Sequence, residues 1–193
     1  ASVSFEVAGG LGVAAQTAMG ALRCVDVQAG DVVVVAGAAG GVGGVVTQLA
    51  ISRGASVIGI ASPANADYLR SLGATPVAYG EGLEQRIREA APSVTAFVDC
   101  FGGYASLAHR LGVAGKRVGT LVPTPAIALH RARFTGGRHG TISDIATVAG
   151  MVADGSVTLT IARTYPLEVE QVRAAYQELM GGHVRGKIVI TAS

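Results

Sequence analysis

The chain has 193 residues, which is enough for one domain with a sizeable core and little more. Half of the residues are hydrophobic, only 5% are aromatic, and the formal net charge is +2 at neutral pH. So small a charge argues against a nucleic-acid partner, and the aliphatic composition suits helices packed closely on a sheet.

Predicted helices and strands alternate along the chain. In chain order we expect a helix at 11–25, a strand at 32–36, a helix at 41–53, a strand at 56–61, a helix at 65–72, a strand at 75–78, a helix at 83–90, a strand at 95–99, a helix at 104–112, a strand at 116–122, a helix at 142–154, a strand at 158–162, a helix at 168–180 and a strand at 187–191. This alternation predicts an α/β fold, namely a doubly wound Rossmann parallel sheet of about six strands with helices on both faces. Ligands of such sheets bind at the carboxyl ends of the strands.

The first strand leads into a glycine-rich turn with the spacing Gly37-x-x-Gly40-x-x-Gly43, and an apolar helix follows. The free N–H groups and the dipole of that helix would point at a phosphate group. No Gly-Lys-Ser/Thr follows, so the pattern indicates a dinucleotide site and not a P-loop. The alternative is a tight strand–helix turn that binds nothing.

The end of the second strand bears on which dinucleotide binds. Sites for NAD usually place a carboxylate there to hold the ribose 2′-hydroxyl, but here Ser62 follows the strand and the next carboxylate is Asp67. A small hydroxyl leaves room for a 2′-phosphate, which favours NADP (NADPH) over NAD. Ser62 is equally suited to cap the next helix.

Asp99 ends the fourth strand and is followed by Cys100 and the pair Gly102-Gly103. Asp99 would either shape the floor of a nicotinamide pocket or cap the next helix. We interpret Cys100 as a small core residue and not as a nucleophile. No Gly-x-Ser-x-Gly elbow of a serine hydrolase is present.

The segment from His130 to His139 contains three arginines and two histidines. Such a run can meet phosphates or RNA, but it is short, and aromatic residues do not alternate with its basic ones. We interpret it as a solvated loop.

Six short runs stand out along the chain: AlaGlyAlaAlaGlyGlyValGly (36–43), ThrGlnLeuAla (47–50), GlyAla (54–55), SerLeuGlyAla (71–74), PheValAspCysPheGly (97–102) and HisValArgGlyLysIleValIle (183–190). Together they resemble the zinc-independent medium-chain dehydrogenase/reductases, and the branch of quinone oxidoreductases and enoyl reductases is the most similar. They follow one another in order over nearly the whole chain.

The resemblance implies a Rossmann domain that binds NADPH, with the pyrophosphate on backbone N–H groups. The cofactor-binding residues that it implies are Ala39, Gly40, Gly41, Val42, Ser62, Asn65, Tyr79, Cys100, Leu121, Phe134 and Lys187. Among them Ser62, Asn65 and Tyr79 match the 2′-phosphate positions. Many relatives have a lysine where this chain has Asn65, and Arg70 is a candidate to replace that cation.

The resemblance also implies chemistry without a metal. Val13 stands where zinc-dependent relatives supply a cysteine ligand, and the four histidines have no ligand spacing among them. The two cysteines are far apart and give no disulfide framework, which is typical of cytoplasmic proteins. The glycines within the apolar run 32–46 argue against a membrane helix.

Family members carry an N-terminal catalytic domain to which nothing here corresponds. We therefore expect residues 1–163 to form the cofactor-binding domain, and residues 164–193 to be a helix–strand segment that packs on the missing domain. A homodimer is an alternative way to cover that segment. The implied activity is hydride transfer to a quinone, enone or enoyl substrate, with no catalytic residue in this chain. The alternative is a non-catalytic nucleotide-binding or scaffold domain.

Overall fold

The computed structural model describes residues 3–192, so the outermost ends of the two predicted domains lie outside the described residues. Its main sheet has six parallel strands in the order β3–β2–β1–β4–β5–β6. The strands are β1 (Val32–Ala36), β2 (Ser56–Ala61), β3 (Thr75–Ala78), β4 (Ala96–Asp99), β5 (Val118–Thr120) and β6 (Arg133–Phe134). This order is that of a Rossmann fold, and the predicted fold class is confirmed.

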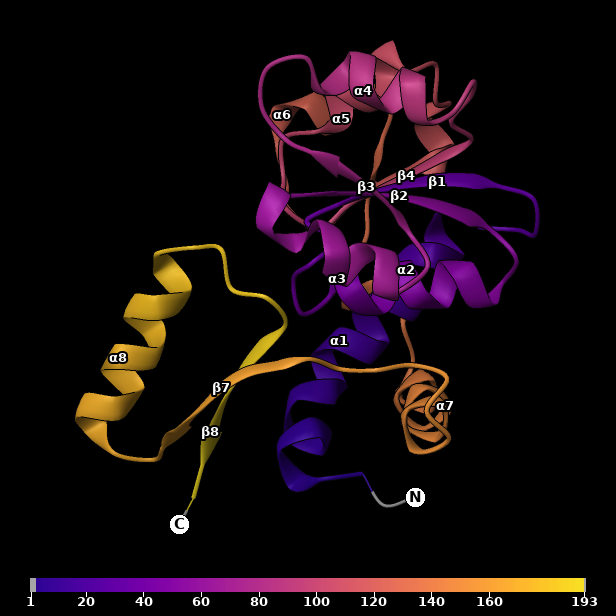
Figure 1. The fold of residues 1–193 in the computed structure, drawn as a ribbon. Coiled ribbons are helices and arrows are strands. Elements are labelled where there is room, and N and C mark those ends of the chain that lie inside the picture. Colours follow the sequence, from indigo (N-terminus) through magenta and orange to yellow (C-terminus); the bar gives the residue numbers. More distant parts are fainter. Residues whose placement is uncertain (1–2, 193) are drawn as a thin grey trace.

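Helices cover both faces of the main sheet, as Figure 1 shows. One face carries α1 (Phe5–Cys24), α2 (Gly43–Ser52) and α3 (Ala66–Ser71). The other face carries α4 (Leu83–Ala90), α5 (Ala105–Arg110) and α6 (Pro125–Leu129). A further helix, α7 (Ile142–Ala153), packs against α1 away from the sheet. Short 3-10 turns lie at Pro63–Asn65, Gly115–Arg117 and Gly137–His139.

The run of four valines in β1 is explained by burial on both faces. Val33 and Val35 belong to the core under α1 and α2, whereas Val34 and Ala36 belong to the core on the opposite face. Successive side chains of a strand point to opposite sides, so a strand at the centre of a doubly covered sheet must be apolar at every position.

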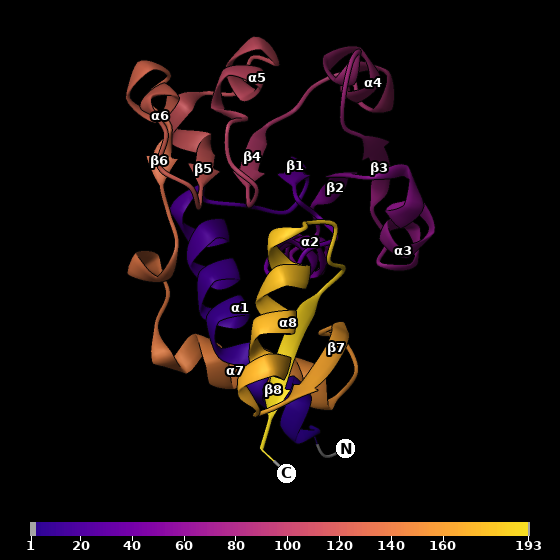
Figure 2. The ribbon, with the colours of Figure 1, turned by 90° about the vertical axis from the view of Figure 1, so that its left-hand side faces the viewer.

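The last part of the chain forms a separate unit beside the main sheet (Figures 1 and 2). It consists of β7 (Ile161–Pro166), α8 (Val169–Met180) and β8 (Lys187–Thr191), and the two strands form their own parallel pair. This unit packs on α1 at Gly10, where an added Cβ would come within 3.5 Å of Ile161 Cδ1 and 3.6 Å of Val189 Cγ2. We call β7, α8 and β8 the C-terminal unit below.

Several predicted boundaries were wrong for local reasons. The strand expected at 158–162 begins only at Ile161, because the backbone N–H of Thr158 is bound by the side chain of Gln48 at 2.7 Å. The helix expected from 11 begins at Phe5, where Ser4 caps it by accepting from Val7 N. The strand expected at 116–122 is shorter than predicted, since β5 covers only Val118–Thr120.

The segment interpreted as a solvated loop contains β6, which pairs with β5 at the edge of the sheet. Both residues of β6 are exposed, so the sequence has no hydrophobic pattern there that would predict a strand. Helix α6 was missed for the same reason, since none of its residues is buried. Within residues 3–192, no helix is both long and apolar enough to cross a membrane.

A single ion pair ties α7 to α1. The guanidinium of Arg23 donates to both carboxylate oxygens of Asp144 at 2.8 and 3.2 Å, and also to the carbonyl of His139. The Asp144 side chain is only 7% exposed and also closes the capping box with Thr141 at the start of α7. The hydrogen bonds from Arg23, and then those from Thr141, lower the pKa of Asp144 below its usual value.

We expect Asp144→Asn to lower the free energy of unfolding at pH 7 by about 1–2 kcal/mol, because the charged hydrogen bonds to Arg23 are lost. A carboxyl group whose pKa is depressed by folding stabilises the protein fully above its unfolded pKa of about 4, and this contribution disappears as the pH falls through the folded pKa. Urea denaturation should therefore show the wild type and the variant converging in acid. Asp67→Asn, which removes an exposed pair with Arg70, is the control and should change little. An equal difference at pH 7 and in acid would contradict the assignment.

Candidate cofactor site

The glycine-rich turn joins β1 to α2 at the carboxyl edge of the main sheet. Gly37 has a φ of +70°, which an L-residue rarely adopts, and its carbonyl accepts from Gly40 N at 3.0 Å. A Cβ on Gly43 would overlap the carbonyl oxygen of Gly37. The turn therefore requires glycine at 37 and 43, and it brings the N-terminus of α2 close to the strand.

The C-terminal unit closes on this turn. Gly186 N donates to Ala39 O at 3.0 Å, and Gly40 and Gly186 form an isolated parallel bridge. The side chain of Lys187 lies so close over Gly41 that a Cβ there would overlap its methylene carbons. The family resemblance implies that Gly41 binds the cofactor, and the structure adds that the missing side chain at Gly41 makes room for Lys187.

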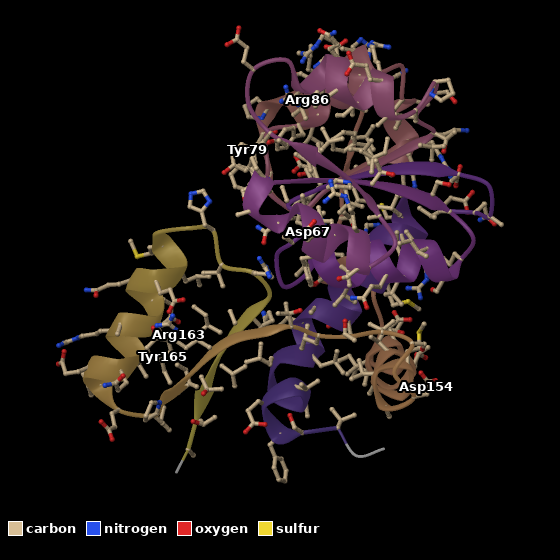
Figure 3. The ribbon with its side chains drawn as sticks, in the orientation of Figure 1. Asp67, Tyr79, Arg86, Asp154, Arg163 and Tyr165 are labelled. Atoms are coloured by element: carbon tan, nitrogen blue, oxygen red, sulfur yellow. The ribbon has the colours of Figure 1, made fainter. Side chains whose placement is uncertain are left out.

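A cavity of about 470 Å³ lies between the turn, the ends of β2 and β4, and the loop that follows α8. It is lined by Gly37, Ala39, Gly40, Ile60, Ala61, Ser62, Asn65, Tyr79, Cys100, Phe101, Tyr104, Gly182, His183 and Val184. Six of the eleven predicted cofactor residues are thus brought together. Tyr79 lies at the sheet edge that faces the C-terminal unit (Figure 3).

The other five predicted residues do not line this cavity. Gly41, Val42 and Lys187 line an adjoining hollow that shares Gly37, Gly40 and Cys100 with it. Leu121 and Phe134 follow or end β5 and β6 at the same sheet edge, but they line neither hollow.

A third hollow of about 640 Å³ continues from Ser62 and Asn65 to the C-terminal unit, and Arg185 lies in its wall. Arg185 Nε donates to Asn65 Oδ1 at 2.7 Å, and its guanidinium carbon lies 5.3 Å from the centre of the Tyr68 ring. Asn65 Nδ2 in turn donates to Ser62 Oγ at 3.0 Å. A cation from the C-terminal unit therefore stands beside the residues predicted to hold a 2′-phosphate.

Sequence reasoning missed Arg185, although it lies within the run 183–190 that carried the family resemblance. The proposed substitute, Arg70, pairs with Asp67 at 2.6 Å and lines none of these hollows. Only the approach of β8 to the turn could reveal Arg185, because 120 positions separate it from Asn65 in the sequence. Ser62 stands at the cap position of the 3-10 turn, but its hydroxyl makes no capping bond there.

Asp99 stabilises the loop that follows it. It is 1% exposed and accepts hydrogen bonds from the backbone N–H groups of Phe101, Gly102 and Tyr104 at 3.1, 2.6 and 2.9 Å. Asp99 therefore holds the loop between β4 and α5, but it does not cap α5, whose N-cap position is Tyr104 and has no side-chain capping bond. Burial, and then the charge of Asp99, raise the pKa of the Cys100 thiol, which is consistent with its interpretation as an unreactive residue.

Val13 is 67% exposed on α1, at the position where zinc-dependent relatives have a ligand. Across residues 3–192, no three histidine, cysteine or acidic side chains converge as metal ligands would.

Residues 72–190 match a family model described as zinc-binding dehydrogenase. The chain belongs to the zinc-binding dehydrogenase family. Among solved structures it is similar to the quinone oxidoreductase from Coxiella burnetii, with 31% identity and a TM-score of 0.82 over 97% of this chain and 61% of that one. The chain therefore corresponds to the cofactor-binding domain of a medium-chain dehydrogenase/reductase, an oxidoreductase class.

Two further structures share the fold at lower identity. An NAD-dependent alcohol dehydrogenase is 22% identical, with a TM-score of 0.84 over 99% of this chain and 60% of that one. The CurK enoyl reductase is 20% identical, with a TM-score of 0.82 over 99% of this chain and 64% of that one. The chain thus spans about three fifths of the length of these structures. A search of the curated proteins found no match.

We expect Gly43→Ala to lower the free energy of unfolding by about 1–3 kcal/mol, because its methyl group overlaps the Gly37 carbonyl and forces the turn open. The matched control is Gly150→Ala within α7, where a Cβ meets nothing within 4 Å. It should stabilise the chain by about 0.5–1 kcal/mol through helix propensity alone. Thermal and urea denaturation measure both; equal effects of the two substitutions would show that the turn does not require glycine at 43.

Proposed function

We propose that the chain is the NADPH-binding part of an oxidoreductase that transfers hydride to a quinone, enone or enoyl thioester without a metal. The observation that carries the proposal is the set of hollows at the carboxyl edge of the main sheet, with a glycine turn at one end and Arg185 beside Ser62 and Asn65 at the other. A dinucleotide is an extended ligand, and its phosphates, ribose and adenine would be spread between these two ends.

The residues present fit a dinucleotide. The N–H groups that open α2 are suited to a pyrophosphate, and the Lys187 ammonium group adds a positive charge beside them. Tyr79, Phe101 and Tyr104 give the cavity of about 470 Å³ an aromatic wall for the apolar parts of the cofactor. In this arrangement the chain holds and orients the cofactor, and the nicotinamide supplies the hydride.

The preference for NADPH rests on charge. The described part of β2 and its following turn contain no carboxylate before Asp67, which is exposed and paired with Arg70. Arg185 instead offers a planar cation whose Nε already contacts Asn65. An arginine is suited to bind a phosphate with two parallel hydrogen bonds, and it has no such partner on the 2′-hydroxyl of NADH.

The C-terminal unit supports the proposal that further protein packs on this domain. Val169, Tyr176 and Met180 form an exposed stripe along α8, and Met180 is 84% exposed. On the opposite side of that unit, Arg163 and Tyr165 point from β7 toward α8 and meet Glu178 (Figure 3). An apolar stripe of this kind is typical of a helix with a packing partner. We propose that the catalytic domain of the relatives covers it.

Titration of the chain with NADPH and NADH tests the cofactor assignment. We expect saturable binding of NADPH, and Arg185→Gln should weaken it by about tenfold, because a charged hydrogen bond to phosphate contributes about 1.5–3 kcal/mol. The affinity for NADH should hardly change. Arg70→Gln is the control and should leave both affinities unchanged. No saturable binding of either cofactor would refute the cofactor assignment and favour the scaffold alternative.

Hydrogen exchange tests the uncovered surface of α8. We expect the amides of α8 to exchange much faster than those of β1 and β4, because few buried contacts oppose local opening of this helix. Light scattering on the same sample distinguishes a monomer from a homodimer that covers the stripe. A monomer in which α8 is as protected as β1 would contradict the proposed packing on a further domain.

A further inference from the structure

A hollow of about 720 Å³ lies at the amino edge of β5 and β6, on the opposite side of the main sheet from the glycine turn. It forms where the end of α5 leads into β5 and the end of α6 leads into β6, two helices that lie near each other in Figure 2. Its ionisable lining residues are His109, Lys116, His130, Arg131 and Arg133. No acidic residue lines it. It includes part of the segment that sequence reasoning treated as a solvated loop.

The walls of the hollow are held in place by specific contacts. The rings of His109 and His130 stack with their centres 4.7 Å apart, and Ser106 Oγ lies 2.9 Å from His130 Nε2. Gly115 packs directly under this loop, because a Cβ there would come within 2.7 Å of the Arg131 carbonyl. Arg131 itself adopts a φ of +54°, which non-glycine residues rarely do.

Three of the five basic groups have structural roles. His109 lies in the last turn of α5 and stacks on His130 at the end of α6, and His130 is also held by Ser106. Arg133 donates to Cys24 O at 2.9 Å. Lys116 and Arg131 differ, since neither has a side-chain hydrogen bond or ion pair to any residue in the range 3–192.

We propose that this hollow binds a small anion that carries two or more phosphate groups, held between Lys116 and Arg131. A concave surface lined by one sign of charge concentrates the opposite charge, and arginine and lysine are the usual phosphate-binding side chains. The hollow is larger than a single phosphate requires, and it contains no aromatic side chain except the two imidazoles. A single-stranded nucleic acid would need aromatic side chains on which its bases stack. The inference does not depend on the proposed oxidoreductase function.

Calorimetric titration of the full chain with tripolyphosphate at physiological ionic strength tests the proposal. We expect a saturable binding step that the double substitution Lys116→Gln with Arg131→Asn weakens by about tenfold or more, the loss expected for two charged contacts to phosphate. Asparagine is chosen at 131 because it tolerates a positive φ. Both side chains are exposed, so the thermal midpoint should stay unchanged.

Two controls separate this hollow from other sites. Arg138→Gln removes an exposed cation of the same segment outside the hollow and should leave the affinity unchanged. Arg185→Gln with Lys187→Gln removes the cations of the cofactor site and should also leave this binding step unchanged. The proposal is overturned if tripolyphosphate does not bind saturably, or if only the cofactor-site variant weakens it. Tighter binding of a single-stranded RNA that depends on Lys116 and Arg131 would also overturn it.

Discussion

The contact between the glycine turn and the start of β8 is the constraint on which the candidate site depends. Gly186 donates to Ala39, and Lys187 lies over Gly41, so two segments almost 150 positions apart share one surface. Both segments need glycine, but against different neighbours: a Cβ at 41 would strike Lys187, whereas a Cβ at 186 would strike the backbone of Thr160 just before β7. The turn therefore receives a second segment of its own chain beside the place where we propose that a phosphate binds.

This contact converts a common strand–helix turn into a set of connected hollows. Without the C-terminal unit, Ser62 and Asn65 would have only a short polar loop to offer a ligand. With it, Arg185 lies beside Ser62 and Asn65, where it donates to Asn65 and packs over the Tyr68 ring. The same unit leaves an apolar stripe on α8 uncovered, so its inner face lines the candidate cofactor site while its outer face is exposed.

The main sheet supplies the rigid support. Its central strands are buried on both faces, and the loops at its carboxyl edge carry their own internal hydrogen bonds, such as those from the backbone to Asp99. Such loops present backbone groups with little freedom, which lowers the entropy lost when a ligand is bound. The amino edge of the same sheet carries a different surface, rich in unpaired positive charge, where no dinucleotide motif lies.

The sequence by itself determined the first five strands of the main sheet, and the family resemblance implied six residues that line one cavity. The valines of β1, the spacing of Gly37, Gly40 and Gly43, and the alternation of strand and helix are local patterns, and each reflects burial or backbone geometry within a few residues. The family resemblance added Tyr79 and Lys187, whose positions local patterns leave open.

Only the tertiary structure decided what depends on distant segments. Strand β6 has two exposed residues and no periodicity, so its place in the sheet comes from pairing with β5 alone. The separate pairing of β7 with β8, the removal of Thr158 from a strand by Gln48, and the place of Arg185 beside Asn65 all depend on contacts between residues far apart in the sequence. The physical reason is that hydrogen bonds and charges between remote segments leave no periodic signal in either segment.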